Sequence, residues 1–308
     1  MPTHDADIAL LTDPRFAAPE AAPGDWYRAN ILLEDRLLAD ALRTHGLSAK
    51  RVDWSDPGVD WTRFRAAVFR TTWDYFDRFD EFTAWLERAE RATRLINTPS
   101  IVRWNMDKHY FADLEGCGIP VVASRYIARG ATRPLAQEME EAGWADAIVK
   151  PCVSGGARDT FRIDRDGAVA LEPRFRTLVA EKSFLLQPFM RDIVTTGEDT
   201  VVVLGGHVTH AVRKKAKAGD FRVQDDHGGT VHAHEAAPDQ VALAERAMAA
   251  VDRFADTAPV YGRVDMVRDD DGRLAVMELE LLEPELWMRT HPPAAVVLGE
   301  ALARTLAG

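Results

Sequence analysis

The sequence predicts an α/β N-terminal domain followed by an α+β region in two parts. In the first hundred residues, short apolar runs alternate with segments of helical periodicity, as in parallel βαβ units. Further along, strand-like runs follow one another across turns, without helices between them. The 308 residues also suit two or more packed units, because single hydrophobic cores stop growing near this size. We expect domain boundaries near residues 100 and 190.

The N-terminal domain is expected to begin with a strand and a capped helix. Apolar residues over 8–12 predict the strand. Asp25 is a suitable N-cap for a helix over 26–44, whose apolar residues recur at helical spacing, and Gly46 follows as its end. The next predicted elements are strands over 51–54 and 66–70 and a helix over 80–91.

From residue 100 onward the pattern changes to one short helix followed mainly by strands. Asn105 is the expected N-cap of a helix that runs to Asp113, with Gly116 and Gly118 after its end. Turns rather than helices connect the later strands, which indicates an α+β arrangement. Strands are predicted over 121–127, 147–150, 184–187, 200–204, 208–212, 261–267 and 274–282, and helices over 238–254 and 292–306.

The composition is that of a globular protein with an acidic balance. Its 38 basic and 49 acidic side chains give a formal net charge of −11, and 46% of the residues are hydrophobic. These values exclude a disordered, collagenous or coiled-coil chain and argue against duplex nucleic acid or anionic lipid as a partner. Cys117 and Cys152 form no metal-binding or disulfide pattern, and no export signal or membrane span is visible. We expect a cytoplasmic protein, and a homodimer stays open.

The strongest local signal is a hairpin near the C-terminus that carries carboxylates on both strands. The Asp-Gly pair at 271–272 is a favoured two-residue turn, and it would place Asp265 directly across from Glu278. Directly opposed residues share one face of a sheet, and Glu280 points to that face as well. Clustered carboxylate oxygens suit Mg²⁺ when phosphates complete its coordination. We therefore expect a metal site, the alternative being an exposed hairpin in which Arg263 pairs with Glu280.

Several cationic residues are candidates for binding phosphate. Lys150 ends an apolar strand signal, and the glycine-containing loop 154–160 follows it, whose N–H groups could approach phosphate oxygens. The spacing of this loop matches neither a Walker A loop nor the dinucleotide-binding fingerprint. Lys108 lies in the helix expected from Asn105, and a basic run occupies 213–217. Lys150, the loop and the basic run are each equally compatible with an ordinary surface, and for Lys108 a solvated side chain is the default interpretation.

The order of these motifs resembles the ATP-grasp superfamily, in the branch of bacterial glutathione synthetase and the ribosomal-protein S6 modification ligase. A helical lysine, a strand-end Lys-Pro with its loop, a Gln-Pro-Phe strand exit, a Gly-Glu pair, a basic loop and the carboxylate hairpin follow one another over about 95–290. Segments 69–75, 103–108 and 220–229 further resemble the group of the O-ureido-serine cyclo-ligase, which closes the cycloserine ring.

The resemblance implies a domain order and a role for each candidate residue. The implied domains are an N-terminal α/β domain over 1–100, an ATP-grasp lid over 101–190 and a C-terminal subdomain with the metal site over 191–308. Glu280 departs from the superfamily, where asparagine is common at the third metal position. The implied ATP-binding residues are Lys108, Lys150, Gln187, Pro188, Phe189, Glu198 and Lys214. The residues implied to face the transferred phosphoryl group are Arg213 and Arg222, with Lys214 competing for the role of Arg213. The residues implied to hold two Mg²⁺ ions are Asp265, Glu278 and Glu280.

A substrate site is expected at the end of the third predicted strand. Arg70 lies at the carboxyl end of that strand, where parallel sheets present ligand contacts, and its guanidinium could clamp a substrate carboxylate. Trp73 and Asp74 would add an aromatic wall and a partner for an amine. The alternative is a structural salt bridge of Arg70 beside core aromatic residues.

The function implied by the resemblance is that of an ATP-dependent ligase. A carboxylate or carbamoyl group of an amino-acid-like substrate would become an acyl phosphate, which an amine of the same or a second molecule then attacks. Positioning and charge neutralisation supply the catalysis, so no side-chain nucleophile is needed, and roles for His227 and Cys152 stay open. The alternatives are a glutathione-synthetase-type ligase that joins two molecules, and a small-molecule kinase on the same nucleotide site.

Overall fold

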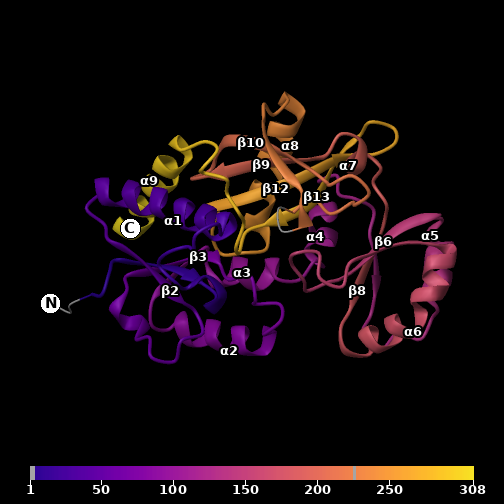
Figure 1. The fold of residues 1–308 in the computed structure, drawn as a ribbon, viewed down its shortest axis with the longest axis horizontal. Coiled ribbons are helices and arrows are strands. Elements are labelled where there is room, and N and C mark those ends of the chain that lie inside the picture. The colour runs from indigo at the N-terminus through magenta and orange to yellow at the C-terminus, as the bar shows by residue number, and fades with distance from the viewer. Residues whose placement is uncertain (1–3, 225–226) are drawn as a thin grey trace.

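The computed structural model describes residues 4–224 and 227–308, which form three sheets in successive parts of the chain (Figure 1). The first sheet is parallel, with the strand order β2-β1-β3-β4, and confirms the predicted α/β unit. Asp25 caps the first helix by accepting the backbone N–H of Arg28, as expected. The elements are β1 (Ile8–Thr12), α1 (Trp26–Thr44), β2 (Ala49–Asp53), β3 (Ala66–Thr71), α2 (Phe79–Ala89) and β4 (Arg94–Ile96).

The second sheet is antiparallel, with the order β5-β8-β6-β7, and lies with its two helices at one end of the molecule (Figure 1). We call this unit the lid. β7 and both helices were not predicted from the sequence, and Pro173 inside the longer helix interrupts the helical pattern there. The lid elements are β5 (Arg125–Ile127), α5 (Leu135–Ala142), β6 (Asp146–Pro151), β7 (Phe161–Asp164), α6 (Arg165–Glu181) and β8 (Phe184–Pro188).

The third sheet has the order β11-β10-β9-β12-β13 and is covered on both faces. Residues of α3, α4 and α8 pack in the core on one face, and residues of α1 and α9 pack in the core on the other. The elements are α3 (Pro99–Asn105), α4 (Tyr110–Gly116), α7 (Asp192–Thr195), β9 (Glu198–Leu204), β10 (His207–Lys215), β11 (Thr230–His234), α8 (Pro238–Ala250), β12 (Tyr261–Arg268), β13 (Leu274–Glu280) and α9 (Pro293–Ala307).

Asn105 does not cap a helix, contrary to the sequence-based expectation. It is the last residue of α3, and its buried side chain is bonded to the main chain next to the carboxylate hairpin. Its Nδ2 donates to the carbonyl of Leu279 at 2.8 Å, and its Oδ1 accepts the N–H of Leu281 at 2.7 Å. These bonds fasten α3 to the third sheet, and the hydroxyl of Tyr110 in α4 accepts the N–H of Leu279 at 3.1 Å. Both helices fall in the range expected for the lid.

The carboxylate hairpin has the predicted pairings but not the predicted turn. Asp265 is paired with Glu278, and Arg263 with Glu280. Residues 269–273, rather than a two-residue turn, connect the strands. A register shift next to Asp265 adds one residue to β13 and compensates for the different loop, so the pairings at the site are those expected from the sequence.

Candidate active site

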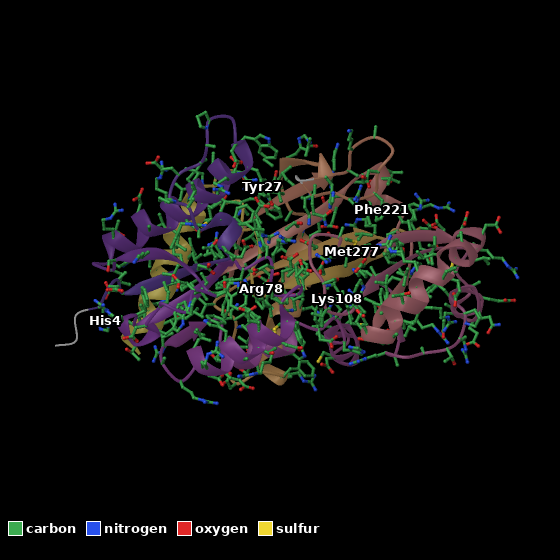
Figure 2. All side chains as sticks on the ribbon, turned by 60° about the horizontal axis from the view of Figure 1, so that its bottom comes forward. His4, Tyr27, Arg78, Lys108, Phe221 and Met277 are labelled. Atoms are coloured by element: carbon green, nitrogen blue, oxygen red, sulfur yellow. The ribbon has the colours of Figure 1, made fainter. Side chains whose placement is uncertain are left out.

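A cavity of about 440 Å³ is lined by residues from the N-terminal domain, the lid and the third sheet. Its volume falls within the range of about 300–1,000 Å³ that is usual for ligand pockets. Lys108, Phe221 and Met277, which line it, lie in the middle of the molecule between the N-terminal domain and the lid (Figure 2). The cavity therefore collects side chains that are far apart in the sequence.

The predicted carboxylates meet at the floor of this cavity. One oxygen each from Asp265, Glu278 and Glu280 lies within 4.8 Å of the others. Asp265 is almost fully buried and accepts a 2.7 Å hydrogen bond from the hydroxyl of Thr200 on the neighbouring strand. Three carboxylates so close together form the oxygen-rich donor set that suits Mg²⁺.

Cationic side chains offset part of this negative charge. Lys214 Nζ lies 2.9 Å from Asp265, and the guanidinium of Arg263 donates to the same carboxylate at 3.0 and 2.8 Å. Arg263 also forms an ion pair with Glu280. Burial raises the pKa of Asp265, but Arg263 and Lys214 outweigh it, so this pKa lies well below its usual range. Burial raises the pKa of Glu280 to about 7. Arg263 opposes this shift, and the charges of Glu278 and Asp265 add to it.

Two predicted lysines face the carboxylates from the other side. Lys108 lies between α3 and α4 rather than within a helix, and its Nζ is 2.7 Å from the carbonyl oxygen of Ser154 and 3.1 Å from Glu278. Its backbone N–H donates to the carbonyl of Cys152 at 2.9 Å, which ties it to the end of β6. Burial lowers the pKa of Lys150, and the neighbouring Lys108 lowers it further. Two ammonium groups beside a metal site form a suitable environment for phosphates.

The strand exit after β8 is only partly in the cavity. Gln187 and Pro188 line it, and Gln187 Nε2 donates to the hydroxyl of Ser124 at 2.9 Å. Phe189 lies outside the cavity with its ring 3.6 Å from the guanidinium carbon of Arg162. Its backbone N–H already donates to the carbonyl of Asp146 at 3.0 Å, so this donor is not free for a nucleotide base.

Glu198 and Lys214 form a buried ion pair in the cavity wall. They are paired across β9 and β10, and both are nearly inaccessible to solvent. Burial raises the pKa of Glu198 to about 7; Lys214 opposes this shift and Asp265 adds to it. Glu198 therefore lies beside the carboxylate cluster.

Arg213 does not face the cavity, contrary to the expectation that it contacts the transferred phosphoryl group. Successive side chains of a strand point to opposite faces, so Lys214 points into the cavity and Arg213 points away from it. Arg213 instead forms a two-bond ion pair with Asp199 at 2.6 and 2.8 Å. Arg222 does line the cavity, where its guanidinium is bonded to Asp220 at 2.7 Å.

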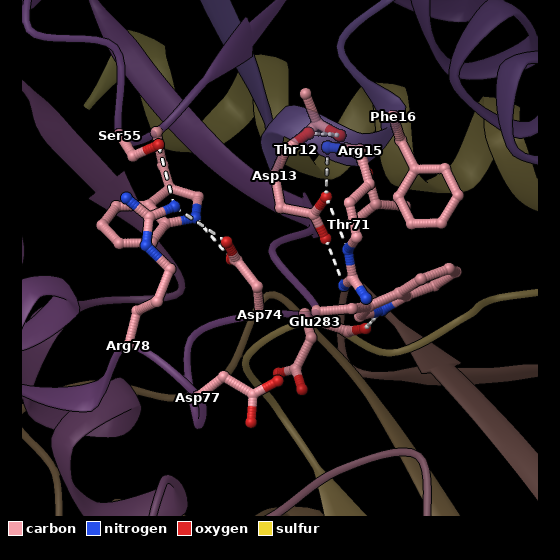
Figure 3. Close-up of polar contacts among 12 residues, drawn as sticks. Thr12, Asp13, Arg15, Phe16, Ser55, Thr71, Asp74, Asp77, Arg78 and Glu283 are labelled. Atoms are coloured by element: carbon pink, nitrogen blue, oxygen red, sulfur yellow. Dashed lines mark hydrogen bonds and ion pairs between the residues drawn. The ribbon is translucent and has the colours of Figure 1, made fainter.

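Of the three residues expected to bind substrate, only Trp73 lines the cavity. Arg70 is buried against α1, where its Nε donates to Asp35 at 3.0 Å, which is the structural salt bridge considered as the alternative. Asp74 accepts hydrogen bonds from Trp54 Nε1 at 2.8 Å and Arg78 Nη1 at 2.9 Å (Figure 3). The bonds of Arg70 and Asp74 thus hold the N-terminal domain together.

Several residues that line the N-terminal side of the cavity were not predicted from the sequence. Arg15 and Phe16 follow β1, Tyr27 lies in α1, and Glu283 follows β13. Arg15 directly follows the Asp-Pro pair that ends the first strand, and the carboxyl ends of parallel strands are where α/β sheets bind ligands. The position of Arg15 directly after a predicted strand was therefore the signal in the sequence that could have identified it as a cavity residue.

His227 and Cys152 lie outside the cavity. His227 Nε2 is 3.3 Å from the carbonyl oxygen of Gly156, in the glycine-containing loop. Burial raises the pKa of Cys152 to about 11, so its thiol is protonated at neutral pH. Cys152 is therefore not placed to act as a nucleophile in the cavity, and the role of His227 as a general base stays a prediction.

Comparison with known proteins identifies the family. The model of the N-terminal domain of D-cycloserine synthetase DcsG matches residues 8–97. The cycloserine biosynthesis protein DcsG of Streptomyces lavendulae is 36% identical over 291 residues, which cover 87% of this chain and 92% of the relative. The chain belongs to the DcsG family of ATP-grasp ligases. A crystal structure of D-cycloserine synthetase DcsG matches this DcsG-family chain with a TM-score of 0.82 and 33% identity, over 97% of the chain and 99% of the solved one.

A more distant solved structure supports the same fold. The RimK domain protein ATP-grasp from Sphaerobacter thermophilus matches this DcsG-family ligase with a TM-score of 0.64 and 19% identity, over 96% of the chain and 99% of the solved one. This match and that of the DcsG structure confirm the predicted ATP-grasp fold, and the DcsG relatives confirm the predicted ligase class. None of the helices in residues 4–224 and 227–308 is long and apolar enough to span a membrane.

Proposed function

We propose that this DcsG-family ligase uses ATP and Mg²⁺ to convert the carboxylate of a small amino-acid-like substrate into an acyl phosphate. The observation that carries the proposal is the meeting of Asp265, Glu278 and Glu280 with Lys108 and Lys150 in one cavity. The carboxylates alone would attract cations, and the lysines alone would attract anions. Their combination matches a metal-bound polyphosphate, which carries both charges.

The residues of the cavity divide into a metal group and a nucleotide group. Asp265, Glu278 and Glu280 would hold two Mg²⁺ ions, which neutralise charge on the phosphates. Lys108 and Lys150 would bind the phosphates. Gln187 and Pro188 would contact the adenine through their backbone, and Glu198 would contact the ribose, with Lys214 holding its carboxylate in place.

The reaction follows from what these groups position. An oxygen of the substrate carboxylate attacks the γ-phosphorus, and the bond to ADP breaks. A nitrogen nucleophile then attacks the carbonyl carbon of the acyl phosphate, and inorganic phosphate leaves. Lys214 and Arg222 line the cavity where negative charge builds up on the transferred group, so they would stabilise it. No protein nucleophile takes part, in agreement with the protonated and buried Cys152.

The nitrogen nucleophile is proposed to belong to the same molecule, so that the product is a ring. The relative in Streptomyces lavendulae is a cycloserine biosynthesis protein, and O-ureido-serine is the first substrate to test. The cavity volume of about 440 Å³ lies near the lower end of the usual range for ligand pockets, which favours a small substrate beside the nucleotide over a peptide.

The test is an assay of ADP release against a panel of amino acids that includes O-ureido-serine, with mass spectrometry of the products. The proposal expects ADP, phosphate and a cyclic product from one amino acid. A condensed product that contains a second amine would indicate a ligase of the glutathione synthetase type. A stable phosphoester would indicate a kinase and contradict the proposal.

A further inference from the structure

A buried carboxylate holds the guanidinium of Arg15 in place. Asp13, at the end of β1, is fully buried and binds the guanidinium of Arg15 through both carboxylate oxygens (Figure 3). Arg15 Nε donates to Asp13 Oδ1 at 3.1 Å, and Nη2 donates to Oδ2 at 2.6 Å. The backbone N–H of Arg15 donates to the same carboxylate at 2.8 Å. A two-bond contact with a buried carboxylate fixes the plane of the guanidinium.

Asp13 occupies only part of the Arg15 guanidinium. A guanidinium has five N–H groups in a planar fork, and Asp13 uses two of them. Within residues 4–224 and 227–308, no other acceptor is bonded to the remaining Nη groups of Arg15. The Arg15 side chain is 54% exposed and lines the cavity. Its free edge has the geometry that binds a carboxylate with two parallel hydrogen bonds.

Glu283 is an acidic residue on the same side of the cavity as Arg15 (Figure 3). Trp73 Nε1 donates to the backbone carbonyl of Glu283 at 3.0 Å, and the Trp73 ring contacts that of Phe16, with the ring centroids 5.6 Å apart. These contacts connect the residue next to Arg15 with the segment that carries Glu283 (Figure 3). The Glu283 side chain lines the cavity, and among the described residues no cation forms an ion pair with it. Burial raises the pKa of Glu283 well above its ordinary value, and the neighbouring Glu280 adds to the shift. A ligand ammonium group at hydrogen-bonding distance would offset this and keep the carboxylate charged.

The rings of Phe16, Tyr27 and Trp73 limit the space around these two charged groups. The centroids of Phe16 and Tyr27 are 6.1 Å apart, and those of Tyr27 and Trp73 are 6.2 Å apart. Rings in mutual contact form a continuous apolar wall. A ligand that lies between Arg15 and Glu283 is therefore bounded by a surface that offers few hydrogen bonds to a branched or charged side chain.

We propose that Arg15 and Glu283 recognise the two charged groups of an α-amino acid, Arg15 binding the carboxylate and Glu283 the ammonium. The inference deepens the proposed function and rests on it. It assigns a residue of this chain to each charged group of that substrate. It also assigns recognition of the carboxylate to Arg15 instead of Arg70, whose guanidinium is buried against Asp35.

The test compares Arg15→Met and Arg15→Lys with the control Arg43→Met. Arg43 is an exposed arginine of α1 that is paired with Asp40 and lies outside the cavity. Binding of O-ureido-serine is measured by calorimetry with Mg²⁺ and a non-hydrolysable ATP analogue, together with the KM values of both substrates. We expect Arg15→Met to raise the Kd and KM of the amino acid roughly 10- to 100-fold and Arg15→Lys to raise them less, with the KM of ATP unchanged.

Substrate analogues distinguish recognition from a structural role. The carboxamide analogue should bind the wild type and Arg15→Met equally, and the analogue without the amino group should bind the wild type and Glu283→Gln equally. The Arg15 variants could fold poorly because Asp13 loses its partner. In that case the double variant Asp13→Asn with Arg15→Met is used instead of the single variants, since it removes both charges together.

These measurements distinguish failure of the inference about Arg15 and Glu283 from failure of the proposed function. The inference is overturned if the wild type turns over O-ureido-serine and Arg15→Met has an unchanged KM for it. It is also overturned if the variants lose affinity equally for the substrate and the analogues. Both results leave the proposed function standing. A wild type that neither binds nor turns over any amino acid would overturn the proposed function itself.

Discussion

Replacing Glu278 with glutamine removes one negative charge from the carboxylate cluster while keeping the size of the side chain. Glu278 is paired with Lys108 at 3.1 Å and lies beside Asp265 and Glu280. Burial raises the pKa of Glu278, but Lys108 and Lys150 outweigh it, so this pKa lies below its usual range and the wild-type side chain is charged at neutral pH.

The effect on stability should be small because two changes oppose each other. The variant loses the attraction between Glu278 and Lys108 but also loses the repulsion from Asp265 and Glu280. Partly exposed ion pairs contribute about 0–1 kcal/mol, so we expect the free energy of unfolding to change by less than about 1 kcal/mol. Turnover should fall by a factor of about 100 or more, or roughly 2.7 kcal/mol in the barrier, because a metal ligand that stabilises transferred charge is lost.

The assay measures kcat/KM at several Mg²⁺ concentrations and the midpoint of urea unfolding for Glu278→Gln. The control is Glu245→Gln, an exposed position of α8. The reasoning is refuted if Glu278→Gln turns over like the wild type at limiting Mg²⁺, or if the variant loses activity only because it unfolds.

Three further predictions concern Glu280, the two cysteines and Asn105. Mg²⁺ binding should weaken as the pH falls below 7, because the pKa of Glu280 is raised to about 7 and a protonated carboxyl is a poor ligand; calorimetry that gives equal affinity at about pH 6 and pH 8 would contradict this. Iodoacetamide at about pH 8 should modify Cys117 before Cys152, because burial raises the pKa of Cys152 to about 11; peptide mass spectrometry would reveal the opposite order. Asn105→Ala should lower the free energy of unfolding by about 2–4 kcal/mol, since two buried main-chain groups lose their partner; a change below about 0.5 kcal/mol in urea denaturation would be inconsistent.

The parts of the site that lie on local strand patterns were predictable from the sequence. Alternation along two neighbouring strands is enough to bring Asp265, Glu278 and Glu280 to one face. The loop and the register shift were not foreseen, because the Asp-Gly pair favours a two-residue turn and no local pattern marks the extra residue on β13. Their effects cancel, so the pairings at the site did not depend on the turn.

The errors occurred where a side chain has a distant partner or lies near the end of a strand. Arg70 is directed away from the cavity by Asp35 on α1, a contact that no local pattern indicates. Arg213 and Lys214 are adjacent basic residues, and only the register of β10 decides which of them faces the cavity. The role of Asn105 likewise depends on Leu279 and Leu281, more than 170 positions away in the chain.

The most direct test of the central claim follows the oxygen of the substrate carboxylate. With O-ureido-serine labelled with ¹⁸O in its carboxylate, formation and collapse of an acyl phosphate transfers one labelled oxygen to the inorganic phosphate that leaves. We predict that mass spectrometry finds one ¹⁸O atom in each phosphate released during turnover. Phosphate that contains no label would contradict activation of the carboxylate by ATP.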